Sequence, residues 1–124
     1  GIVFNLAAAP VGDNQSFIFF ADRNTNNIYD DTWDCPLGGA SECADKTTLL
    51  SGNYISDLCI IDAGGENCNG IDTLDISFVR PAIEAKIYYN GGSTGVKGAR
   101  IELSSPDGKK NSIVVYVTGQ ISVQ

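Results

Sequence analysis

The stretch ARIELSSPDGKKNSIVVYVTGQISV, residues 99–123, decides the fold class of this chain. In 99–103 apolar and charged side chains alternate, which is the two-residue period of a β-strand with one buried face. A turn signal follows at 105–108, where Pro presets φ and Gly tolerates a positive φ. The apolar run 113–117 and the short segment 120–123 flank a second Gly-containing turn. This pattern predicts three strands joined by tight turns.

The same period extends through the rest of the chain, and helix signals are scarce. Leu74, Ile76 and Phe78 face one way, while Asp75 and Ser77 face the other. Further strands are predicted at 2–6, 17–20, 47–50, 54–61 and 87–89. The run FIFF at 17–20 predicts a strand buried on both faces. We therefore expect one all-β domain over residues 1–124, with about eight to ten short strands.

Composition limits the classes of function. The 124 residues have a net charge of −7 and are 43% hydrophobic, which is typical of a globular chain. Of the 15 acidic side chains, 13 lie in residues 1–84, whereas five of the eight basic ones lie in 85–124. An acidic chain repels phosphate backbones, so a nucleic-acid partner is disfavoured. No run approaches the roughly 18 apolar residues of a transmembrane helix, and the chain is expected to be soluble as given.

The four cysteines predict disulfides. Cys35 and Cys43 are spaced C-x7-C, Cys59 and Cys68 are spaced C-x8-C, and the chain has no histidine. These spacings differ from the close pairs of zinc knuckles, and an even cysteine count in a small Gly-rich chain favours disulfides and an oxidising compartment. Three pairings are possible. Cys35–Cys43 and Cys59–Cys68 are favoured, because closing a short loop costs little entropy.

A calcium loop is the sharpest local motif, in the segment DRNTNNIYD at 22–30. Its oxygen donors fall at the first, third, fifth, seventh (a backbone carbonyl) and ninth positions of an EF-hand-like loop. These positions hold Asp22, Asn24, Asn26, Ile28 and Asp30. Asn27 replaces the usual glycine at position six, and Trp33 replaces the bidentate glutamate at position twelve. The alternative is a polar loop held by Asx-turns.

Catalytic motifs are missing from the sequence. Without histidine there is no Ser-His-Asp or Cys-His arrangement, and no nucleophile elbow or phosphate-binding loop is present. We therefore expect the chain not to be an enzyme. Trp33 and the five tyrosines suggest two uses, a carbohydrate-binding platform or sheet packing, and packing is favoured.

Three segments resemble GspH/FimT-type minor pilins of type IV pili and type II secretion pseudopilins. FFADRNTNNIYD at 19–30, ISFVRP at 76–81 and NSIVVYVTGQISV at 111–123 are similar to stretches that follow each other in the same order in that family. The resemblance implies a β-sandwich-like pair of antiparallel sheets that normally packs on a long N-terminal helix, which this sequence lacks.

The resemblance also implies a role in assembly rather than chemistry. The partners would be other pilin or pseudopilin subunits, the head would be periplasmic or extracellular, and the missing helix would anchor the full-length form in the inner membrane. Some FimT-like members bind DNA through G-R-x-R, but Gly119, Gln120, Ile121 and Ser122 stand there in this sequence. The competing hypothesis is a secreted carbohydrate- or protein-binding β-sandwich of the adhesin kind, with an exposed aromatic row near Trp33.

Overall fold

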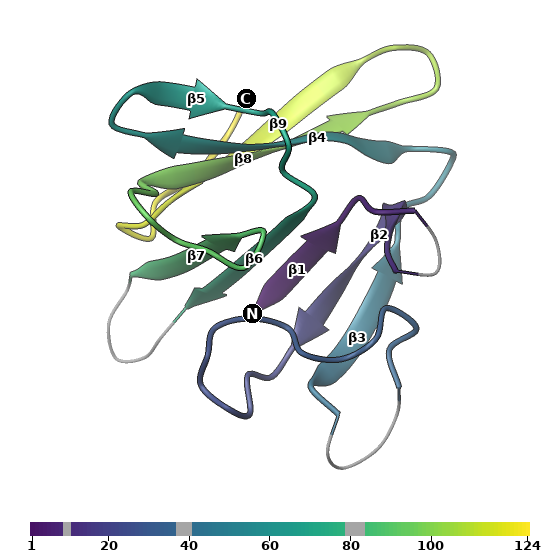
Figure 1. Cartoon of the computed structure of the whole chain (residues 1–124). Coiled ribbons are helices and arrows are strands. Elements are labelled where there is room, and N and C mark those ends of the chain that lie inside the picture. Colours follow the sequence, from purple (N-terminus) through teal and green to yellow (C-terminus); the bar gives the residue numbers. More distant parts are fainter. Residues whose placement is uncertain (9–10, 37–40, 79–83) are drawn as a thin grey trace.

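A computed structural model of the chain describes residues 1–8, 11–36, 41–78 and 84–124. Within these ranges there are ten β-strands and no helix (Figure 1). The end of the resemblance segment 76–81 lies outside the described residues.

The first sheet is antiparallel, with the strand order β3-β2-β1-β6-β7. Its strands are β1 (Ile2–Asn5), β2 (Asp13–Phe20), β3 (Cys43–Thr48), β6 (Thr73–Phe78) and β7 (Ala85–Tyr89). The N-terminal strand β1 lies at the centre, because it pairs with β2 on one side and with β6 on the other.

The second sheet is also antiparallel, with the strand order β10-β9-β8-β4-β5. Its strands are β4 (Tyr54–Asp62), β5 (Gly65–Asn67), β8 (Gly98–Ser104), β9 (Lys110–Tyr116) and β10 (Ile121–Val123). The stretch 99–123 thus forms the predicted meander β8–β9–β10. Gly108 and Gly119 have φ of 89° and 92° in its two turns, where glycine avoids the strain of a side chain.

The two sheets face each other (Figure 1), and apolar side chains from both form the main core. The first sheet contributes Phe4, Leu74, Ile76 and Ile87, and the second contributes Ile55, Leu58, Ile60, Ala99, Ile101 and Val115. A smaller cluster of Val3, Ile18, Phe20 and Trp33 lies on the outer face of the first sheet. The expectation of an all-β fold with two antiparallel sheets is confirmed.

Some local predictions were wrong. The strand 17–20 is not buried on both faces: Ile18 and Phe20 are buried, but Phe19 is 44% exposed. The strand expected at 47–50 begins earlier, at Cys43, and leaves Leu50 78% exposed. Residues 65–67, expected to be loop, form the edge strand β5 because their backbone pairs with β4.

The described residues include no helix of the length and hydropathy needed to cross a membrane.

Candidate functional site

A long loop after β2 covers the outer face of the first sheet and carries the predicted calcium ligands. Trp33 fastens this loop to the sheet: it is only 6% exposed, packs in the cluster with Val3 and Ile18, and donates its indole N–H to Asp13 Oδ2 over 3.0 Å. Trp33 therefore anchors a loop whose side chains at 21–32 and 34–36 are exposed or half-buried.

Asp22 and Asn27 close the first turn of this loop. The Asn27 backbone N–H donates to Asp22 Oδ2 over 2.7 Å, and Asn27 has a φ of 65°. Asparagine tolerates this left-handed conformation better than most residues, so it replaces glycine here at low cost. The other oxygen, Asp22 Oδ1, is buried and has no hydrogen-bond partner among the described residues.

The structure brings three more of the predicted ligands together. The side-chain amides of Asn24 and Asn26 both donate to Asp30 Oδ2, over 2.6 and 2.7 Å. Their oxygens accept backbone N–H groups two residues on, from Asn26 over 3.3 Å and Ile28 over 3.0 Å. These are the Asx-turns of the alternative prediction.

Glu42, which the sequence did not single out, holds both ends of the loop. Its side chain accepts the Arg23 N–H at Oε2 over 3.0 Å and the Asp30 N–H at Oε1 over 2.7 Å. The Glu42 N–H donates to Asp31 Oδ2 over 2.5 Å, and the residue is 5% exposed. A buried carboxylate is tolerated here because backbone donors replace its water.

Asp75 on β6 connects the loop to the sheet through a hydrogen bond. Its Oδ2 accepts the Tyr29 N–H over 2.8 Å, and the residue is 2% exposed because the loop lies over it. Burial raises the pKa of Asp75 to about 6, and the nearby charges of Asp30 and Glu42 also raise it, against the lowering effect of the Tyr29 hydrogen bond. The alternation at 74–78 is present, but Asp75 and Ser77 are buried on the outer face of the first sheet instead of facing solvent.

The aromatic platform, which was the less favoured of the two uses considered for Trp33 and the tyrosines, is not on the surface. Trp33 is buried, and all five tyrosines are half-buried. The Tyr29 hydroxyl donates to the Thr32 carbonyl over 2.6 Å within the same loop. The rings therefore pack and close turns, and the exposed row near Trp33 that would favour carbohydrate binding is not seen.

An apolar groove opens between the two sheets, on the side of β9 and β10. It has a volume of about 360 Å³. The lining comes from Gly1, Ile2, Phe4, Phe19, Ile76, Phe78, Ile101, Ile113, Val115 and Ile121. Phe19, Phe78 and Ile121 are 44%, 50% and 56% exposed. The sandwich core is thus left uncovered along this side.

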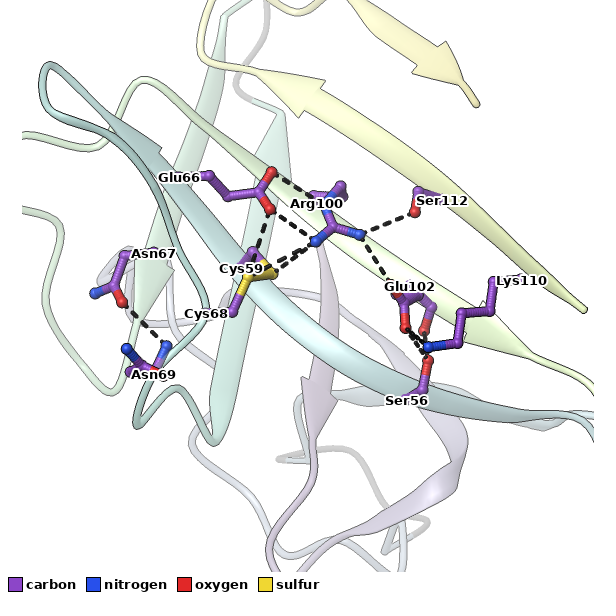
Figure 2. Close-up of a disulfide and its surroundings, with 10 residues drawn as sticks. All are labelled: Ser56, Cys59, Glu66, Asn67, Cys68, Asn69, Arg100, Glu102, Lys110 and Ser112. Carbon is purple, nitrogen blue, oxygen red and sulfur yellow. Dashed lines mark hydrogen bonds and ion pairs between the residues drawn. A yellow bond between two sulfur atoms is a disulfide. The ribbon is translucent and has the colours of Figure 1, made fainter. Parts of the chain in front are cut away.

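An ion-pair network lies beside the second disulfide (Figure 2). Arg100 contacts Glu66 over 2.7 Å and Glu102 over 3.2 Å, and its Nη2 lies 3.3 Å from Cys59 Sγ. Lys110 adds a contact to Glu102 over 3.6 Å. This network connects β5, β8 and β9 beside the Cys59–Cys68 disulfide. The sequence did not predict it, because charged residues that alternate with apolar ones in a strand are also typical of an ordinary solvent-exposed face.

Both cysteine pairs are disulfides. Cys35 is bonded to Cys43 with a Cα–Cα distance of 5.3 Å, and Cys59 to Cys68 with 4.1 Å. This is the pairing favoured from the short loops. Asp57 lies beside Cys59 and Cys68, but a disulfide leaves no thiolate for a metal. The two bonds indicate an oxidising environment.

The positions that match the DNA-binding motif of FimT-like proteins form the last turn and β10. The Gly119 N–H donates to the Tyr116 carbonyl over 2.8 Å, and Ile121 and Ser122 pair with Val115 and Val114. No basic side chain stands among these four residues.

Comparison with models of protein families, with curated proteins and with solved structures found no match to this chain.

Proposed function

We propose that this chain is the head of a minor pilin or pseudopilin, a structural subunit that assembles into or initiates a type IV pilus or a type II secretion pseudopilus. The apolar groove is the observation that carries the proposal. Exposed apolar surface of this kind marks a surface that another apolar element covers. A helix with an apolar stripe fits a groove whose walls come from two layers.

The N-terminal strand supports a helix of the same chain as the occupant. Gly1 lines the groove, and β1 runs from there into the centre of the first sheet. A helix placed before Gly1 would enter the groove without a long connection. In this proposal that helix anchors the subunit in the inner membrane, the head is periplasmic or extracellular, and the subunit acts in filament assembly or protein transport without catalysis.

The positions of two of the resemblance segments support this proposal. Residues 19–30 form the end of β2 and the loop over the sheet, and residues 111–123 form the β9–β10 hairpin that borders the groove. The partners would be neighbouring pilin or pseudopilin subunits, reached through the surfaces that the helix leaves free.

The encoded sequence upstream of Gly1 tests this proposal first. We expect a short basic leader ending in Gly, then Phe or Met and a continuous apolar helix with an early Glu. A cleavable signal peptide directly before Gly1 would contradict it. That result would favour the alternative, a secreted protein-binding or adhesin-like module whose groove receives a segment of another protein.

Photo-crosslinking in the full-length protein tests the occupant directly. A benzophenone amino acid replaces Phe19 at the groove, and in the matched control it replaces Leu50, which is 78% exposed and does not line the groove. We expect a crosslink from position 19, but not from 50, to the chain's own upstream segment. A crosslink from position 19 only to a different protein would overturn the helix as occupant.

A further inference from the structure

The guanidinium of Arg100 lies against the Cys59–Cys68 disulfide (Figure 2). Its Nη2 is 3.3 Å from Cys59 Sγ and 3.7 Å from Cys68 Sγ. Carboxylates hold the group in this place, because Nε and Nη2 donate to Glu66 over 3.0 and 2.7 Å and Nη1 donates to Glu102 over 3.2 Å. A positive charge is thus fixed next to both sulfurs, on a planar group whose orientation is set by its hydrogen bonds.

The contact with sulfur is the weakest that this guanidinium makes. Its other N–H groups donate to oxygens, on Glu66, on Glu102 and, over 3.0 Å, on Ser112. A disulfide sulfur is a poor acceptor, whereas a thiolate carries a full negative charge and is stabilised by a neighbouring arginine. Arg100 therefore interacts more strongly with a Cys59 thiolate than with the closed disulfide, which favours Cys59 as a leaving group.

The two sulfurs differ in their access to solvent. Cys59 on β4 is fully buried, whereas Cys68 follows the edge strand β5 and is half-buried, between the exposed residues Asn67 and Asn69. A reagent from solvent therefore reaches Cys68 first. Strand β5 pairs with β4 over only three residues, 65–67, and their side chains are all exposed. Opening the disulfide thus releases an edge segment that contributes no side chain to the core.

We propose that Cys68 is a site of thiol–disulfide exchange, at which a small, positively charged thiol forms a mixed disulfide. The incoming thiolate bonds to Cys68 Sγ, the bond to Cys59 breaks, and Cys59 leaves with the electron pair as a thiolate beside Arg100. One disulfide replaces another, so the step needs no further oxidant or reductant, and the proton of the incoming thiol passes to solvent. This site is independent of the function proposed above.

The charges around Cys68 select the kind of thiol. Glu66 Oε1 lies 3.5 Å from Cys68 Sγ, and a carboxylate oxygen of Asp57 lies within 4.8 Å of both sulfurs of the disulfide. The chain as a whole has a net charge of −7. A negatively charged thiol is therefore repelled on approach, whereas an aminothiol is attracted.

The Cys35–Cys43 disulfide is a reference within the same molecule. Both of its cysteines are half-buried, and no hydrogen bond among the described residues joins either sulfur to a basic side chain. It offers accessible sulfur without a guanidinium to stabilise the leaving thiolate. Access alone therefore predicts exchange at both disulfides, whereas the Arg100 contact predicts exchange first at Cys59–Cys68.

Timed exchange with cysteamine tests the site. The oxidised chain is incubated with excess cysteamine, and samples are quenched with acid, treated with N-ethylmaleimide and mapped by peptide mass. We expect the cysteamine adduct on Cys68 and maleimide on Cys59, before the other disulfide reacts. Glutathione, which is negatively charged, is expected to react more slowly at the same thiolate concentration. Earlier reaction at Cys35–Cys43, an adduct mainly on Cys59, or an equal rate with glutathione would overturn the proposal.

The matched variants are Arg100→Met and Lys97→Met. Each removes one positive charge, but Arg100 contacts the sulfurs whereas Lys97 is exposed. The rate is measured relative to that of Cys35–Cys43, because an unfolded chain exposes both disulfides alike. We expect this relative rate to fall about tenfold in Arg100→Met and to stay unchanged in Lys97→Met, with Arg100→Lys recovering part of it. Equal relative rates in Arg100→Met and the original chain would contradict the role of the guanidinium and overturn the proposal.

Discussion

Each disulfide of this protein lies beside a group of carboxylates, and the two groups are neutralised in different ways. Next to Cys59–Cys68, Glu66 and Glu102 face the guanidinium of Arg100 (Figure 2). Next to Cys35–Cys43, Glu42 faces only backbone N–H groups. The first group is thus paired with a side-chain cation, whereas Glu42 in the second is held by backbone amides.

The pKa values reflect this difference. Hydrogen bonding from Arg100 lowers the pKa of Glu66, and hydrogen bonds from Ser56 and then Arg100 lower that of Glu102. In the other group, burial raises the pKa of Asp75 to about 6. The same kind of side chain is thus held in its charged form in one group and pushed toward its neutral form in the other.

The largest expected effect comes from truncating a carboxylate in each group. Glu42→Ala leaves two partly buried backbone N–H groups without their acceptor, and we expect a loss of about 4 kcal/mol in the free energy of unfolding. Glu102→Ala removes a partly exposed partner of Arg100 and should cost about 1 kcal/mol. Urea unfolding of both variants measures the difference. Equal losses would mean that removing the acceptor of the backbone amides costs no more stability than removing the partner of Arg100.

The second effect concerns pH. The folded-state pKa of Asp75 is raised to about 6 from 3.8. Its contribution to stability is therefore fully present below pH 3.8 and lost as pH rises through 6. At about 1.4 kcal/mol per pKa unit this loss is about 3 kcal/mol.

Asp75→Asn keeps an acceptor for the Tyr29 N–H and cannot ionise. We expect it to be more stable than the original chain at pH 7, with the advantage disappearing by pH 4. Unfolding free energies measured at half-unit steps of pH would show this. An advantage that does not change with pH would show that the ionisation of Asp75 is not its source.

A third effect compares the disulfides themselves. The two bonds close loops of nearly the same length, with sequence separations of 8 and 9. The chain-entropy contribution is therefore nearly equal, about 2.5 kcal/mol for each. Replacing both cysteines of a pair by serine should cost more at Cys59–Cys68, because Cys59 is fully buried whereas Cys35 and Cys43 are only half-buried. Thermal unfolding of both double variants tests this order, and a greater cost at Cys35–Cys43 would reverse it.

The smallest expected effect comes from removing the charge of Arg100, the cation that pairs with Glu66 and Glu102. Arg100→Met keeps the length of the side chain and removes its charge, and we expect a loss of about 1 kcal/mol, because the pairs are partly exposed and screened by solvent. Adding salt should reduce the difference between this variant and the original chain. A loss that stays constant from low to high salt would point to packing of the side chain instead of its charge.

The sequence predicted the strands well, because a period of two is a local signal. The meander 99–123 and the alternation at 74–78 needed only that rule. The sequence did not reveal what lies over each strand. Phe19 is exposed because the groove lies beside it, and Asp75 is buried because a loop some 46 residues away in sequence covers it.

The candidate site shows the same limit. Asp22, Asn24, Asn26 and Asp30 lie within nine residues, so their spacing alone suggested a common site. Glu42 and Asp75 join the loop through tertiary contacts with no local pattern. Trp33 was considered for an exposed platform because an aromatic side chain in a polar segment has no visible packing partner in the sequence. In the structure its partners are Val3, Ile18 and Phe20 from two strands.

The central position of β1 has a mechanical consequence. The strand is hydrogen-bonded to β2 on one side and to β6 on the other, and Gly1 and Phe20 extend the ladder with bonds of 2.8 and 2.9 Å. A pulling force applied at Gly1 along the strand loads all of these bonds at once, in shear, instead of opening them one after another. The domain is therefore built to resist tension that arrives through its first residues.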